Sequence, residues 1–173
     1  MKKELSTNCD NCGKQIKVVK DNQQGNTIYM VHGLFCINIP GFFCDKECFD
    51  KTIEEAKHIE YIDRDDEGKT FIDVDVMIDE TVILDKMYDI VYEVDNPLFP
   101  SLVLQRLLAV DPENVKFLYG LSSLYVGLLA AKNTPDTWKP KLLERLTEVE
   151  EDLKRLSPAG YKRLQRLREH FNV

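Results

Sequence analysis

All five cysteines of this 173-residue chain lie within its first 48 positions, and four of them form two closely spaced pairs. The first pair has the pattern C-x2-C in "CDNCGK", and the second has the pattern C-x3-C in "CDKEC". A disulfide framework would instead spread its cysteines over a short secreted chain. The N-terminus "MKKELSTNCDNCG" contains no apolar segment of signal-peptide length, so we expect a reducing, cytoplasmic environment. There, such pairs indicate metal ligands or a redox couple.

The two pairs predict one zinc site, held by the thiolates of Cys9, Cys12, Cys44 and Cys48. Gly13 directly follows the first pair and permits a tight, partly left-handed turn that points both sulfurs at one ion. The second pair is expected to span the end of a strand and the first turn of a helix, whose N-terminus stabilises a thiolate. Four thiolates close a tetrahedral shell, which is typical of structural rather than catalytic zinc.

Two other side chains could replace an expected ligand. Cys36 and His32 both lie between the pairs. The simpler interpretation makes Cys36 a buried, apolar-like thiol and His32 a hydrogen-bonded hairpin residue. A redox couple is a further alternative for the first pair, but "TNCDNCGKQIKVV" lacks the strand and helix that surround a thioredoxin-type dithiol.

The segment between the pairs predicts short strands. Residues 28–43, "IYMVHGLFCINIPGFF", are apolar and aromatic and are broken by Gly33 and by Pro40–Gly41. The sequence "DKECFDKTIEEAKHI" then predicts an amphipathic helix that continues to about Ile59. Knuckle, hairpin and helix, in this order, make a treble clef.

The motifs "CDNCGKQI" and "GFFCDKEC" resemble the TRASH and MYM/FCS-type zinc fingers, and the related finger of a ribosomal large-subunit protein of archaea and eukaryotes. Those fingers read C-x2-C-G-x-x-I, and then an aromatic residue followed by C-x3-C. The resemblance covers roughly the first 55 residues and implies a treble-clef fold with structural zinc. The chain departs from the pattern in its 31-residue gap between Cys12 and Cys44, and in Asp45, where many such fingers carry Ser.

The middle of the chain is acidic. Between Glu60 and Asp95 there are 13 acidic residues and three basic ones, which indicates a solvated surface. Residues 59–78 contain two β-rich runs around a polar turn at Asp65–Gly68 and predict a hairpin linker. The acidic residues lack the ordered spacing of a calcium-binding loop.

Helical periodicity extends from Asp79 to the end of the chain. Pro97 and Pro100 end the first helical segment, and Ser157 before Pro158 is a strong start signal for the last helix. The predicted helices span residues 79–95, 102–110, 113–133, 137–156 and 158–171. We therefore predict an α+β protein with a zinc-finger domain at 1–58, an acidic β-hairpin linker at 59–78 and a helical bundle of four to five helices at 79–173.

Residues 111–125, "DPENVKFLYGLSSLY", resemble the first helix of a tetratricopeptide repeat. The small residues Gly120, Ser122 and Ser123 would let another helix come close. A stable repeat array needs at least three repeats, and the resemblance covers one helix. A compact bundle is the preferred interpretation, and a true repeat array is the alternative.

The sequence carries no phosphate-binding glycine loop, no nucleophile elbow and no zinc-protease helix motif, so we expect no enzyme. We expect a non-enzymatic adaptor or regulatory module that binds a protein through apolar side chains such as Phe35, Phe42 and Trp138. No apolar run is long enough to span a membrane. A weaker possibility is a metal or redox sensor in which Cys36 is a reactive fifth thiol.

The alternative partner is nucleic acid or the ribosome. Residues 154–168 contain six basic residues and no acidic one. The whole chain, however, carries a net charge of −7 and has a pI near 5, which disfavours nonspecific binding to a polyanion.

Overall fold

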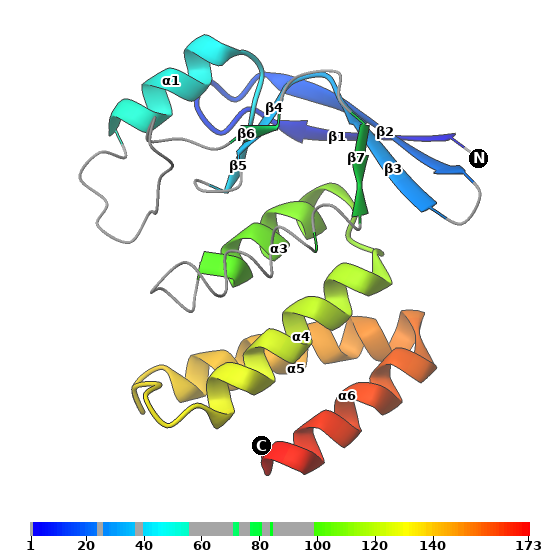
Figure 1. The fold of residues 1–173 in the computed structure, drawn as a ribbon, viewed down its shortest axis with the longest axis vertical. Coiled ribbons are helices and arrows are strands. Elements are labelled where there is room, and N and C mark those ends of the chain that lie inside the picture. Colours follow the sequence, from blue (N-terminus) through cyan, green and yellow to red (C-terminus); the bar gives the residue numbers. More distant parts are fainter. Residues whose placement is uncertain are drawn as a thin grey trace. The chain divides into compact units, whose positions relative to one another are not determined.

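The computed structural model of the chain describes residues 2–23, 26–36, 40–55, 71–72, 77–80, 84 and 99–173. Contacts between residues group the chain into two compact units, Met1–Arg106 and Leu107–Val173, which we call the N-terminal unit and the helical unit. Antiparallel strands dominate the described part of the first unit, and helices make up the second (Figure 1). This arrangement confirms the predicted α+β class.

The first sheet of the N-terminal unit has the strand order β1-β2-β3-β7, and all of its neighbouring strands are antiparallel. Its strands are Lys2–Asn8, Gln15–Gln23, Asn26–Val31 and Met77–Asp79. In β2, Ile16 and Val18 are buried while Lys17 between them is exposed, as in a strand with one covered face. Neither β1 nor β2 is among the predicted strands.

The second sheet has the order β5-β4-β6, with β4 at Leu34–Cys36, β5 at Gly41–Phe43 and β6 at Phe71–Ile72. Strands β3, β4 and β5 confirm the short strands predicted between residues 28 and 43. The turn before β4 requires glycine, because a Cβ atom at Gly33 would overlap the carbonyl oxygen of Phe43.

The aromatic side chains of this sheet form a core. Phe35 and Phe42 face each other in the β4–β5 register, with ring centroids 5.0 Å apart, and they are only 1% and 3% exposed. The ring of Phe43 packs against Phe49, whose helix is thereby held to the sheet, with centroids 5.5 Å apart. The prediction that Phe35 and Phe42 contact a partner protein is therefore wrong, because strand pairing buries both rings.

Helix α1 spans Lys46–Glu55 and confirms the predicted helix as far as Glu55, since residues 56–59 lie outside the described part of the chain. The predicted turn at Asp65–Gly68 and the first β-rich run before it also lie outside it. Of the second run, β6 pairs with β4 and β7 pairs with β3. These strands thus extend both sheets of the N-terminal unit.

The remaining helices are α3 at Phe99–Val110, α4 at Val115–Ala130, α5 at Lys139–Leu156 and α6 at Pro158–Phe171. Each lies within two or three residues of a predicted boundary, whereas most of the helix predicted at 79–95 falls outside the described residues. Helix α3 begins earlier than predicted and takes Pro100 into its first turn, where proline is tolerated. The boundary between the two units lies inside α3, and the division at 58 and 78 stays a prediction.

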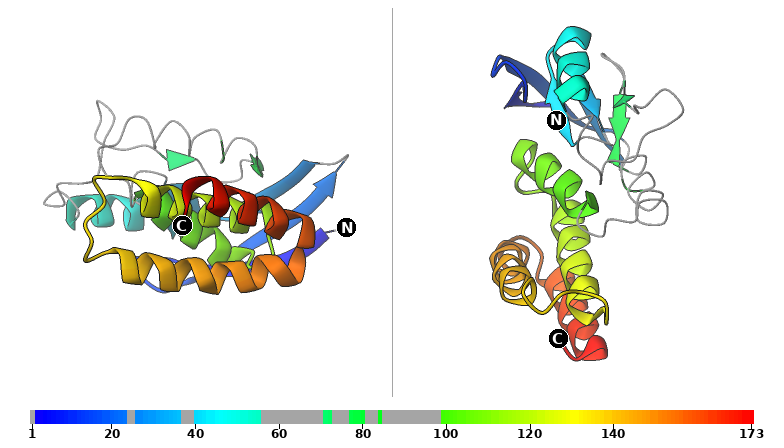
Figure 2. Two further views of the ribbon diagram at one scale, coloured as in Figure 1. Left: turned by 90° about the horizontal axis from the view of Figure 1, so that it is seen from below. Right: turned by 90° about the vertical axis from the view of Figure 1, so that its left-hand side faces the viewer.

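The helical unit is built around α4, which packs against both α5 and α6, while α5 also packs against α6 (Figure 2). Its apolar core includes fully buried side chains from all three helices, among them Phe117, Val126, Leu146, Leu153 and Leu164. Asn114 caps α4 by accepting hydrogen bonds from two backbone amides, and Ser157 caps α6 by accepting one from Gly160. The predicted cap at Ser157 is confirmed.

None of the described helices is both long and apolar enough to cross a membrane.

Candidate metal centre

The structure brings together the four cysteines predicted as metal ligands. Their sulfur atoms all lie within 4.8 Å of one another. We call this group, which consists of Cys9, Cys12, Cys44 and Cys48, the four-cysteine cluster. One pair comes from the turn between β1 and β2, and the other from the end of β5 and the first turn of α1.

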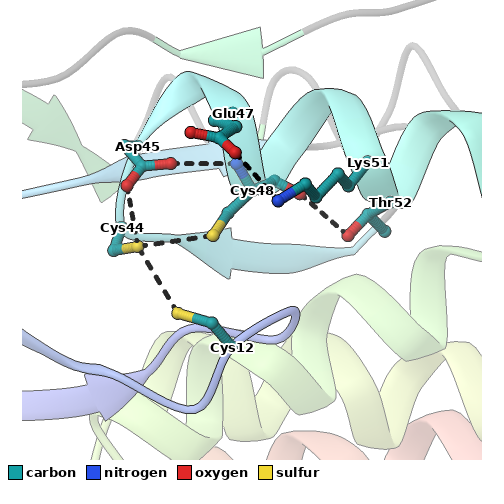
Figure 3. A network of polar contacts seen from close by, with 7 residues as sticks. All are labelled: Cys12, Cys44, Asp45, Glu47, Cys48, Lys51 and Thr52. Carbon is teal, nitrogen blue, oxygen red and sulfur yellow. Dashed lines mark hydrogen bonds and ion pairs between the residues drawn. The ribbon is translucent and has the colours of Figure 1, made fainter.

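The spacing of the sulfurs fits tetrahedral coordination. Four thiolates at about 2.3 Å from a central metal ion would stand about 3.8 Å from one another. The sulfurs of Cys12 and Cys44 are 3.7 Å apart, and those of Cys44 and Cys48 are 3.6 Å apart (Figure 3). A disulfide would hold two sulfurs at about 2.05 Å, and none of the five cysteines forms one. The cluster therefore has the dimensions of a tetrathiolate metal site.

The first pair is presented by a tight turn. The amide of Cys9 donates to the carbonyl of Lys14 at 2.8 Å, and the amide of Gly13 donates back to the carbonyl of Cys9 at 2.9 Å. Gly13 has a φ of 75°, in the left-handed region that favours glycine. The left-handed turn predicted after Cys12 is thus confirmed.

Asp10 joins the two halves of the cluster, and its role was not predicted. Its amide donates to the carbonyl of Phe42 at 2.8 Å, and its carboxylate accepts from the amide of Phe42 at 2.8 Å. A Cβ atom at Gly41 would come within 2.9 Å of that carboxylate, so glycine leaves room for it. The second carboxylate oxygen pairs with Arg106 at 2.9 Å. These contacts fix the turn of the first pair against the strand that leads to Cys44.

Asp45 caps the helix that carries the fourth cysteine. Its carboxylate accepts a hydrogen bond from the amide of Cys48 at 2.9 Å, and its other oxygen lies 3.2 Å from the sulfur of Cys44 (Figure 3). The bond from the Cys48 amide, together with the weaker effect of the bond from Cys44, holds the pKa of Asp45 below its ordinary value. Asp and Ser are both good N-caps, so the departure from the Ser of similar fingers keeps the same structural role.

Two of the thiols, those of Cys9 and Cys44, have different electrostatic environments. Burial alone would raise the pKa of Cys9, but backbone hydrogen bonds from Cys12, Cys44 and Asn11 lower it to about 7. Burial and the neighbouring Asp45 carboxylate instead raise the pKa of Cys44. Binding of a divalent cation would remove the proton from Cys44 and supply the positive charge that the site lacks.

The alternative ligands lie away from the cluster. Cys36 is fully buried in β4, as the simpler interpretation predicts, and burial argues against a reactive fifth thiol. His32 is exposed, and its amide donates to the carbonyl of Lys17 at 3.0 Å, in the turn between β3 and β4. In the described part of the chain, neither side chain joins the four cysteines as a candidate ligand.

Comparisons of the chain with protein-family models, with curated proteins and with solved structures found no match. The likeness to TRASH and MYM/FCS-type fingers therefore rests on the two cysteine motifs and on the order of knuckle, strands and helix around them.

Proposed function

We propose that the four-cysteine cluster binds one zinc ion and that this ion has a structural role. The observation that carries this proposal is the pair of sulfur–sulfur distances, 3.6 and 3.7 Å, close to the edge of a zinc tetrathiolate. The ion would join the turn after β1 to the start of α1. Four protein ligands leave no open coordination position, which supports a non-catalytic site.

Metal analysis of the full chain, purified under reducing and metal-replete conditions, tests this proposal. We expect about one equivalent of zinc per chain. Less than about half an equivalent of any metal would reject the site. A coloured protein would indicate iron, which also binds four thiolates, in place of zinc. Cys44→Ser should lose the metal and Cys36→Ala should keep it, and the reverse result would reject the ligand set.

We propose further that the chain is a non-enzymatic adaptor or regulatory module that binds a protein through its helical unit. Support comes from large apolar side chains exposed on that unit: Trp138 is 38% exposed, Leu143 45% and Phe171 44%. Trp is enriched among the residues that contribute most to binding at protein interfaces. Trp138 is thus the member of the predicted partner-binding set that is available for contact.

Affinity capture with and without nuclease tests the adaptor role. We expect nuclease-resistant capture of a defined protein, weakened at least about tenfold by Trp138→Ser, a typical hot-spot loss. Thr147→Ser, an exposed change in the same unit, is the matched control. Equal capture by all variants would reject Trp138 as the contact.

Nucleic-acid or ribosome binding is the alternative, and one observation favours it. Lys162, Arg163 and Arg166 on α6 are exposed and form no ion pair within the described part of the chain. Two other cations of the same stretch are neutralised, because Arg168 pairs with the buried Glu150 at 2.8 Å and Arg155 pairs with Asp152 at 2.8 Å. The patch is therefore smaller than the sequence indicates.

A salt titration separates the two functions. Three phosphate contacts would give a log-log slope of about −2 to −3 for RNA or DNA binding. We expect no binding tighter than about micromolar at physiological salt, because the net charge of −7 opposes it. Submicromolar binding that is lost when these three charges are reversed would favour the alternative.

A further inference from the structure

The four-cysteine cluster has one edge that faces solvent. Cys12 is exposed and Cys44 is partly exposed, whereas Cys9 and Cys48 are both buried. The sulfurs of the two accessible residues are 3.7 Å apart. A dissolved oxidant can thus reach one pair of thiolates more readily than the other, and the two members of that pair lie next to each other.

The carboxylate of Asp45 lies beside this exposed pair, Cys12 and Cys44, and weakens the binding of the Cys44 thiolate to a metal. One of its oxygens is held by the amide of Cys48 at 2.9 Å, so the carboxylate cannot easily turn away. The other oxygen lies 3.2 Å from the sulfur of Cys44. This contact is a hydrogen bond from the Cys44 thiol, and a Cys44 thiolate would instead lie beside a second negative group, which opposes its retention by the metal.

We propose that hydrogen peroxide oxidises this edge to a Cys12–Cys44 disulfide and thereby releases the metal, so that the four-cysteine cluster is a redox-sensitive element. This inference rests on the proposed metal site. The Cys12 thiolate attacks a peroxide oxygen, the O–O bond breaks, and a sulfenic acid and one water form after protonation. The Cys44 thiolate then attacks the Cys12 sulfur, forms the S–S bond and expels hydroxide, which is protonated to a second water. Two sulfurs together lose two electrons, and these two electrons reduce the peroxide.

Loss of two of the four thiolates leaves the ion with Cys9 and Cys48 only. Two ligands do not hold zinc against water and competing chelators as four do. The remaining cysteine cannot take part, because Cys36 is fully buried in β4 and lies outside the cluster. Oxidation therefore converts the metal-bound finger into a metal-free one, and a dithiol together with zinc would restore it.

The test uses the zinc-loaded full chain treated with hydrogen peroxide at near-stoichiometric concentration. Metal analysis precedes the treatment: absence of zinc before peroxide is added would reject the proposed metal site, whereas the redox inference concerns only the zinc that peroxide releases. Released zinc is measured with a chromogenic chelator, and disulfides are identified by alkylation and non-reducing peptide mapping. We expect one disulfide per zinc released, with the Cys12–Cys44 peptide dominant.

Retention of zinc under conditions that oxidise a free-thiol control peptide would overturn the inference. So would a dominant Cys9–Cys12 or Cys44–Cys48 disulfide, because either product would show that exposure does not select the reacting pair. Release that a dithiol and added zinc do not reverse would point to overoxidation instead and would also count against a switch.

Three variants sharpen the result. Cys12→His keeps a zinc ligand at an exposed position but cannot form the disulfide, so zinc release should slow at least about tenfold. Asp45→Asn keeps a helix cap without the charge and should slow release about threefold to tenfold. Cys36→Ala is the matched control and should release zinc at the wild-type rate. Wild-type rates in the first two variants would overturn the assignment of the edge.

Discussion

The N-terminal unit and the helical unit hold their folds in different ways. In the first, β4 and β5 are only three residues long, and sheets of such strands are marginal without further cross-links. In the second, α4, α5 and α6 have 16, 18 and 14 residues and bury a shared apolar core. If the cluster binds metal as proposed, we expect it to hold β5 and α1 together, in addition to the apolar core of the first unit, whereas the second unit is held by side-chain packing alone.

The largest expected effect comes from removing the metal. Structural zinc sites contribute on the order of 10 kcal/mol to folding, so a strong chelator should unfold the region around β5 and α1. The helical unit has no cysteine and should keep its fold. Amide NMR spectra of the full chain would show both outcomes at once, with collapsed signals from β5 and α1 and dispersed signals from α4 to α6.

Far-ultraviolet circular dichroism gives the complementary measurement. Most of the helical signal should survive chelation, because only α1 among the described helices carries a cluster cysteine. A cooperative loss of the entire helical signal would contradict the comparison and would mean that the two units share one folding transition.

A substitution in the apolar core of the helical unit should destabilise that unit alone. Leu146 is fully buried in α5, and Leu146→Ala should lower the free energy of unfolding of that unit by about 2–5 kcal/mol. Zinc affinity should stay unchanged, since the side chain lies in the other unit. Leu143→Ala, at an exposed position of the same helix, is the control and should cost less than about 1 kcal/mol. Denaturant unfolding combined with a zinc competition assay would check both quantities.

A smaller effect is expected from Asp10, which connects the two cysteine pairs through Phe42. Asp10→Ala leaves the Phe42 amide without its carboxylate acceptor, a loss of about 1–2 kcal/mol, or about tenfold in zinc affinity. Asp10→Asn can still accept this hydrogen bond and should lose less. The zinc affinities are to be measured by competition with a chelator of known strength.

Arg106→Gln separates the two contacts made by the Asp10 carboxylate. It removes only the partly exposed ion pair and should change zinc affinity less than about fivefold. An effect of Arg106→Gln as large as that of Asp10→Ala would show that the ion pair, and not the bond to Phe42, joins the halves of the site.

The difference between the helical unit and the N-terminal unit also explains how much of the fold could be predicted from the sequence. Helical periodicity and local caps are short-range signals, so α4, α5, α6 and the cap at Ser157 were predicted closely. The cysteine spacing likewise identified the members of the cluster. A C-x2-C turn and a C-x3-C helix start each place two sulfurs close together through local geometry alone. The pairing of β6 with β4, and of β7 with β3, depends on contacts between residues far apart in sequence, which periodicity cannot reveal.

Two errors have the same physical origin. Phe35 and Phe42 were predicted to contact a partner because they belong to an apolar run, but the register of β4 and β5 turns both rings into the core. Asp10 was overlooked because an acidic residue inside a C-x2-C motif carries no signal by itself, and its role becomes visible only where Phe42 lies beside it. Strand β2 could have been found, since Ile16 and Val18 alternate with polar residues.

The smallest predicted effect concerns the cap between α5 and α6. The hydroxyl of Ser157 accepts a hydrogen bond from the amide of Gly160 at 3.1 Å, and Ser157→Ala should cost about 1 kcal/mol of unfolding free energy. Ser157→Gly should cost only a few tenths, because glycine is itself tolerated at an N-cap. If the helical unit is held by its core rather than by this single turn, its unfolding stays cooperative in both variants and zinc binding stays unchanged. A separate early melting of α6 in thermal unfolding monitored by NMR would instead show that the turn, and not the packing of Leu164 in the core, keeps α6 in place.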